Sequence, residues 1–147
     1  MAGILYHVLP KTLYDFGTLG ASAVANLTVA TGIDVSRYNS VDIAWRIHTI
    51  NVAGPGTGAT LVLNAFTEAP TSEDPGLEFV CSGVLPGFST MSITSSTAAP
   101  QVNFVTIDNT TSPLGGFIRL ILQGKQSSGP FTAFQVAISI DVVAKEC

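Results

Sequence analysis

The stretch Phe134-Gln135-Val136-Ala137-Ile138-Ser139-Ile140-Asp141-Val142 decides the fold. Its large apolar residues occupy every second position, and the positions between them hold Gln, Ala, Ser and Asp. A period of two is that of a β-strand with one buried face, whereas a helix repeats its apolar residues every three or four positions. We therefore predict that this stretch is a long strand of an antiparallel sheet, with one face packed against the core of the protein.

A second alternating stretch covers residues 41–52. Its apolar side chains occupy odd positions as far as Ile47 and even positions from Ile50 onward. A phase shift of one residue moves every later side chain to the other face unless the strand contains a bulge, which we place near Thr49. The same phase predicts that Trp45 lies in the core.

Seven further segments have the character of short strands, and with the two above they make nine predicted strands. The seven are residues 4–9, 23–30, 60–66, 77–81, 90–94, 102–107 and 117–123. Clusters of Gly, Pro, Ser and Asn separate them, at spacings too short for the helical crossovers of a parallel sheet. No segment shows convincing helical periodicity. We predict an all-β, antiparallel β-sandwich or jelly-roll-like fold, with residues 1–147 as a single domain.

Charge is scarce in this chain. The 147 residues include 6 Lys and Arg and 10 Asp and Glu, so 11% are charged and the formal net charge is −4. An ordinary globular chain has roughly 25% charged residues. The 46% hydrophobic content excludes intrinsic disorder, and the absence of a basic cluster disfavours nucleic-acid binding. A surface with so few charges is suited to burial against other copies of the chain or against a lattice.

No motif in the sequence predicts catalysis. The segment Gly54-Pro55-Gly56-Thr57-Gly58 lacks the Lys and the following helix of a phosphate-binding loop, so we predict a hairpin turn there. His7 and His48 lie on predicted strands, without Cys or acidic residues at zinc-ligand spacing. No G-x-S-x-G motif occurs. We predict no catalytic, cofactor-binding or metal-binding residue, and no enzymatic activity.

The densest acidic group is Glu73, Asp74 and Glu78. Loop carboxylates of this kind are ligands for Ca²⁺, but the spacing matches no known calcium loop, and a solvated acidic loop explains it equally well. The two cysteines, Cys81 within an apolar run and Cys147 at the last position, are interpreted as a buried residue and an incidental thiol.

The start of the chain lacks the positive and apolar pattern of a secretory signal, since its first cation is Lys11. No stretch approaches the length of about 18 apolar residues that a membrane helix needs. We therefore expect synthesis in the cytoplasm and no membrane association.

Residues 31–38, Thr-Gly-Ile-Asp-Val-Ser-Arg-Tyr, and residues 69–75, Ala-Pro-Thr-Ser-Glu-Asp-Pro, resemble small virion proteins of tailed bacteriophages. The resemblance lies in the general character of the sequence and not in a diagnostic motif, and it covers about two thirds of the chain. It implies an all-β head decoration or auxiliary capsid protein that binds the major capsid protein lattice from outside. Such proteins act as homo-oligomers, often trimers, and cement the head without an active site. The implied location is the capsid exterior of the virion, after synthesis in the host cytoplasm.

Residues 1–16 are predicted to form a docking or edge segment, because Lys11 and Asp15 are the only charged residues among them. The loops around Pro70 and Pro113 are the other predicted contact elements.

Two other functions compete with a virion role. One is a carbohydrate-binding or adhesin-type module, in which Tyr6, Tyr14 and Tyr38 would provide aromatic platforms for sugars. The other is an enzyme, for which the residues offer the least support.

Overall fold

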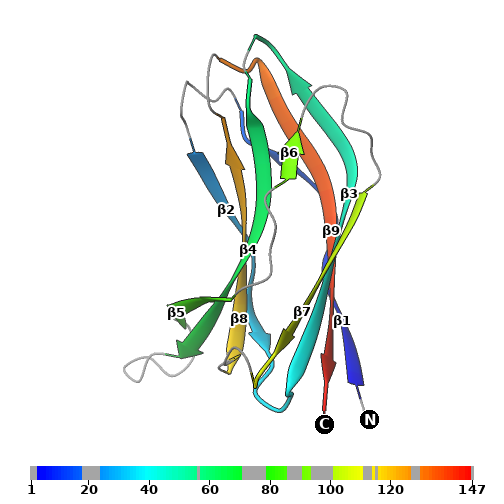
Figure 1. The fold of residues 1–147 in the computed structure, drawn as a ribbon, viewed down its shortest axis with the longest axis vertical. Coiled ribbons are helices and arrows are strands. Elements are labelled where there is room, and N and C mark those ends of the chain that lie inside the picture. The colour runs from blue at the N-terminus through cyan, green and yellow to red at the C-terminus, as the bar shows by residue number, and fades with distance from the viewer. Residues whose placement is uncertain are drawn as a thin grey trace.

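The computed structural model describes residues 3–17, 24–55, 57–70, 79–85, 91–93, 101–110, 114, 116–126 and 130–146. These residues form nine strands and no helix (Figure 1). The strands are β1 (Gly3–Asp15), β2 (Val24–Asp34), β3 (Ser40–Ala53), β4 (Ala59–Pro70), β5 (Phe79–Leu85), β6 (Met91–Ile93), β7 (Gln101–Asp108), β8 (Phe117–Lys125) and β9 (Ala133–Lys145). Each of the nine predicted strands overlaps one of these, and most of the observed strands are longer than predicted. Residues 23, 77, 78, 90 and 94 of the predicted strands lie outside the described residues. None of these residues forms a helix that could cross a membrane.

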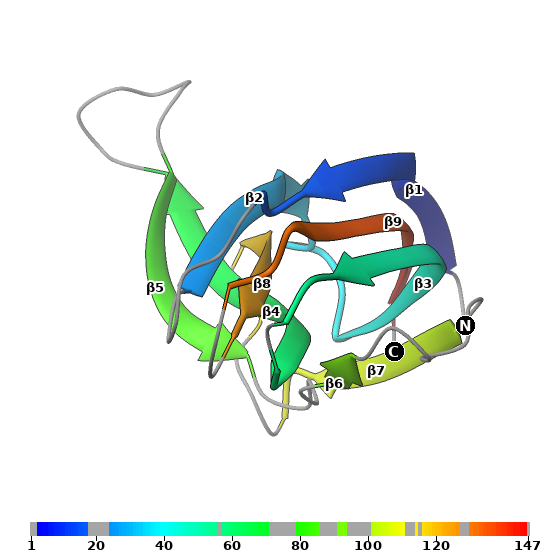
Figure 2. The same cartoon turned by 90° about the horizontal axis from the view of Figure 1, so that it is seen from above.

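The strands lie in two antiparallel sheets, which face each other in Figure 2. We call the sheet with the order β1-β9-β3-β7 sheet A, and the sheet with the order β2-β8-β4-β5 sheet B; β6 also pairs with β4. The pairs are nested along the chain: β1 with β9, β2 with β8, β3 with β7, and β4 with β5 and β6. This is one long antiparallel hairpin rolled up until β3 meets β9 and β4 meets β8. That topology is a jelly roll, so the predicted fold class is confirmed.

The segment Gly54–Gly58 is not a hairpin turn, contrary to the sequence prediction. It joins β3 in sheet A to β4 in sheet B, so the chain crosses from one layer to the other. The crossing passes close to β9, where the Thr132 N–H donates a 2.8 Å hydrogen bond to the Ala53 carbonyl. Gly and Pro occur both in hairpin turns and in connections between two sheets. Only the strands with which β3 and β4 pair distinguish the two kinds of connection.

The core lies between the two sheets and is lined by the inward phase of each strand. On β9, Phe134, Val136, Ile138, Ile140 and Val142 are fully buried, as the alternation predicts. Trp45 is 2% exposed, which confirms its predicted place in the core.

The predicted bulge in β3 is confirmed. The register of β3 against β9 shifts between Ile47 and Thr49, and pairing continues as far as Ala53. The extra residue at this point lets Ile50 and Val52 continue toward the core after the phase change.

An aromatic cluster closes one end of the sandwich beside the start of β9. Phe16, Phe131 and Phe134 pack edge to face, with ring centroids 4.9 and 5.8 Å apart. The Phe16 N–H also donates to the Phe134 carbonyl at 2.9 Å. The ring of Phe16 covers Gly124 so closely that a Cβ there would lie 2.8 Å from its Cδ1. Phe16, the residue that follows β1, thus contacts β8 of sheet B as well as β9.

Candidate interaction surface

The outer face of sheet A, directed away from the core, carries apolar side chains at both of its edges. Side chains alternate along a strand, so the neighbours of buried residues point outward. Of the six exposed large hydrophobic residues in the described part of the chain, four lie in the outward phase of the edge strands β1 and β7, whereas Ile4 on β1 stands opposite the buried Ala144 and has the inward phase. The six are Ile4, Leu5, Leu13, Val24, Val102 and Phe104. Val102 and Phe104, two positions apart on β7, are exposed next to each other, which favours an interaction surface there over a purely solvated face.

The middle of this face is polar and is held together by bonds between strands. The ring of His7 on β1 contacts the carboxylate of Asp141 on β9, with 2.8 Å between Nδ1 and Oδ1. The ring of His48 on β3 contacts Ser139 on β9, with 2.8 Å between Nε2 and Oγ. Both histidines therefore have protein partners. Within the described ranges, no group of three or more His, Cys, Asp or Glu is placed to hold a metal ion.

Asp42 is a nearly buried charge on the same face. It forms an ion pair with Lys145 of β9 and accepts a 2.8 Å hydrogen bond from the Thr106 hydroxyl of β7. The three residues join β9, β3 and β7 across the sheet. Because the Asp42 charge is paired inside the protein, it is not available to bind an external ligand.

Several residues singled out from the sequence lie outside the described residues. These are Glu73, Asp74, Glu78, Pro113 and Cys147. Cys81 lies in β5, and Pro70 is the last residue of β4. The hypothesis of a cation bound by the acidic loop therefore stays a prediction.

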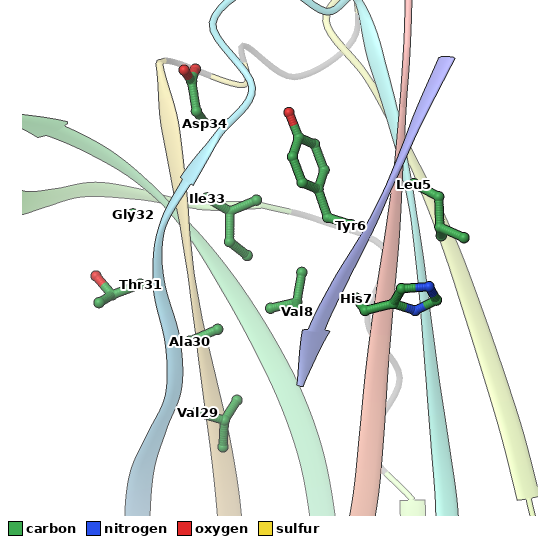
Figure 3. A pocket seen from close by; sticks show the side chains of 10 residues that line it. All are labelled: Leu5, Tyr6, His7, Val8, Val29, Ala30, Thr31, Gly32, Ile33 and Asp34. Carbon is green, nitrogen blue, oxygen red and sulfur yellow. The ribbon is translucent and has the colours of Figure 1, made fainter. Parts of the chain in front are cut away.

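A groove of about 470 Å³ lies between the edge strands β1 and β2, one from each sheet (Figure 3). Tyr6, Val8 and Ile33 point into the space between the strands, whereas Leu5 and His7 lie on the far side of β1. Thr31 and Asp34 of β2 line the groove as well, so its surface is polar and apolar in similar measure.

The three tyrosines proposed as sugar platforms are half-buried and pack against the core. A side-chain hydrogen bond to Tyr38 raises the pKa of Tyr6, and burial raises it further. Burial also raises the pKa of Tyr14. A sugar platform needs an open aromatic face, so these contacts give little support to the carbohydrate-binding alternative.

The sequence did not identify the exposed pair Val102 and Phe104. Residues 102–107 carry apolar side chains in both phases, with Val102 and Phe104 in one and Val105 and Ile107 in the other. The structure buries the second pair and leaves the first 63% exposed. An apolar outer phase in a strand is the signal that could have indicated this surface.

Known proteins share the fold of this chain but not its sequence. No protein-family model matches the chain, and no curated protein matches it. Among solved structures, a chain in the structure of infectious bursal disease virus, Gx strain, is similar with a TM-score of 0.58 at 10% identity. The similarity covers 97% of this chain and 31% of that one. The VP2 subviral particle of the same virus gives a TM-score of 0.49 at 9% identity, with 99% and 38% covered.

This chain therefore spans about a third of the length of the viral chains to which it is similar. At 10% identity the similarity shows the fold alone. The chain has a jelly-roll β fold that is also present in a chain of a virus structure.

Proposed function

We propose that this chain is a non-enzymatic structural protein of a virion, which binds the outer surface of a capsid as a homo-oligomer and stabilises the particle. The observation that carries the proposal is the outer face of sheet A, with exposed apolar side chains on β1 and β7 and, between them, the His7–Asp141 contact and the Asp42–Lys145 ion pair. On this face the charges of Asp42 and Lys145 already pair with each other, so burying them against protein does not leave either one unpaired.

Three further observations support this function. The jelly-roll fold is shared with a chain of infectious bursal disease virus. Residues 31–38 and 69–75 resemble decoration proteins of tailed bacteriophages, which favours a role on the outside of a capsid. The net charge of −4 disfavours contact with packaged DNA and is compatible with an exterior position.

Within this proposal, β1 is the strand that docks on the capsid lattice. It is an edge strand of sheet A, and Leu5 and Leu13 are 52% and 60% exposed on it. The loops around Pro70 and Pro113 remain the other proposed contact elements.

The test is binding of the purified protein to capsids that lack it, measured by co-sedimentation. We expect the wild-type protein to bind and Leu13→Lys to lose most of this binding, because a charge would have to be buried in an apolar contact. Val24→Lys is the matched control, since Val24 is a similarly exposed apolar residue on β2 of the other sheet.

Failure of the wild-type protein to bind would contradict the proposed function. Equal loss of binding in the two variants would contradict the assignment of β1. Binding to a glycan array, abolished by Tyr6→Ala, would instead favour the carbohydrate-binding alternative.

A further inference from the structure

The edge strands of this protein differ in how well they are protected against pairing with another strand. An edge strand presents unpaired backbone N–H and C=O groups, and natural proteins commonly block such edges with bulges, Pro or Lys. The register of β1 against β9 is broken twice, and Pro10 and Lys11 lie at the second break. The register of β2 is also broken twice, and that of β5 once. These three edges therefore resist the addition of a further strand.

The fourth long edge strand, β7, has no such protection. It pairs with β3 at eight consecutive positions, from Gln101 opposite Ile47 to Asp108 opposite Ser40, without a register shift. It contains no Pro, Lys or Arg. In the described part of the chain β3 is its only strand partner, and β7 lies at the margin of sheet A in Figure 2. The regular backbone of residues 102–107 is thus suited to accept another strand.

The side chains on the outer face of β7 are apolar as well as exposed. Val102 and Phe104 are each 63% exposed, more than any other large hydrophobic residue in the described ranges. On the β3 side they stand opposite Arg46 and Ala44. The only charge on β7 is that of Asp108, at its C-terminal end. A partner strand would therefore meet an apolar and nearly uncharged edge.

We propose that β7 pairs in antiparallel direction with β7 of a second copy of this chain, about a two-fold axis. The two four-stranded sheets A would then form one continuous sheet. Val102 and Phe104 of each copy cover those of the other, and pairs between aromatic and β-branched residues on adjacent strands are stabilising. This inference rests on the proposed function, because it names the surface through which the homo-oligomer forms.

Charge and symmetry favour a second copy as the occupant. In an antiparallel pair the two Asp108 carboxylates lie at opposite ends of the contact, whereas a parallel pair would place them side by side. The contact is self-complementary, because each contact of one residue with another across a two-fold axis occurs a second time with the two copies exchanged. It also closes on itself, because a two-fold contact uses the free edge of both copies and leaves none for open-ended growth.

The first measurement is the mass of the protein by size-exclusion chromatography with light scattering at micromolar concentration. We expect the wild-type protein to have twice the chain mass of 15.3 kDa, and Phe104→Lys to have the mass of one chain. Val24→Lys is the matched control, because Val24 is 48% exposed on β2, an edge strand of the other sheet, and it should remain a dimer. Far-ultraviolet circular dichroism checks that each variant is folded. If Phe104→Lys does not fold, Val102→Lys replaces it.

The second measurement is hydrogen exchange, which distinguishes strand pairing from a side-chain contact alone. Backbone amides within residues 102–107 should exchange faster in Phe104→Lys than in the wild-type protein, while those of the central strand β9 stay equally protected. A wild-type monomer or trimer, or a Phe104→Lys protein of unchanged mass, would overturn the proposed pairing. Unchanged exchange in residues 102–107 would also overturn it.

The outcome can be separated from that of the proposed function. A wild-type dimer that does not bind capsids would contradict the capsid function and leave the β7 pairing intact. A monomer that binds capsids would contradict the β7 pairing and the homo-oligomer, and would leave the capsid-binding role intact.

Discussion

Trp45 is the largest side chain of β3, and its strand partners are Asn103 on β7 and Ile140 on β9. Its position in the core follows from the alternation of residues 41–47 alone, because a strand sets every second side chain on the same face. Interior side chains are packed at the density of organic crystals, so an indole removed from this position leaves a cavity that its neighbours cannot fill completely.

We therefore expect Trp45→Ala to lower the free energy of unfolding by about 3–5 kcal/mol. Urea denaturation followed by circular dichroism measures this loss. The tryptophan emission of the native wild-type protein should be that of a buried indole. A variant with the wild-type denaturation midpoint, together with a native emission typical of exposed tryptophan, would show that the inward placement is wrong.

Gly54 is a second residue on which the fold depends, for a reason of backbone conformation. Its φ is +109°, a region that side chains rarely allow, and a Cβ would lie 2.6 Å from the Thr132 nitrogen. We expect Gly54→Ala to cost at least about 2 kcal/mol of stability, from strain and overlap together. The matched control is Gly116→Ala, where nothing lies within 4 Å and φ is ordinary. Equal thermal midpoints for the two variants would contradict this account.

At the scale of elements, the β1 strand is fixed at its end by a carboxylate. Asp15 accepts hydrogen bonds from Gln135 on β9 at 2.9 Å and from the Gly17 N–H at 2.7 Å. These bonds lower the pKa of Asp15, with the Gln135 side chain as the larger cause. A carboxyl whose folded pKa is lowered stabilises the fold fully above its unfolded pKa of about 3.9 and loses that contribution as the pH falls through the folded value.

The variant Asp15→Asn tests this linkage. At neutral pH we expect it to melt below the wild-type protein, because the amide makes weaker bonds than the carboxylate. The difference should shrink as the pH falls below about 4, where the wild-type carboxyl becomes protonated. Thermal melts across this pH range measure it. A difference between the two proteins that is constant down to the lowest pH would rule out a role for the charge.

At the scale of the whole molecule, the scarcity of charge has a consequence for assembly. The contacts proposed for β1 and β7 depend on apolar burial and backbone pairing, while Asp42 and Lys145 of sheet A pair with each other and Asp141 with His7. Salt screens interactions between exposed charges but does not weaken apolar burial. Attachment to a capsid should therefore survive raised ionic strength.

We expect the amount of protein bound to capsids to be unchanged, or slightly higher, when the salt concentration is raised to about 1 M, where the screening length is about 3 Å. Co-sedimentation across a salt series measures this. Release of the protein at high salt would indicate that ion pairs hold it, contrary to the proposed surface.

The amino-acid sequence determined the nine strands, the bulge in β3 and the place of Trp45, because these features follow from alternation and turn residues along the chain itself. It also indicated an all-β sandwich, since no segment had the period of a helix. Neither the connection at Gly54–Gly58 nor the exposed phase of β7 could be derived in this way. Gly and Pro permit a hairpin and a crossing between sheets alike, and residues 102–107 are apolar in both phases. Only the pairing of strands far apart in the chain, β1 with β9 and β3 with β7, decides which face is buried and which edge stays open.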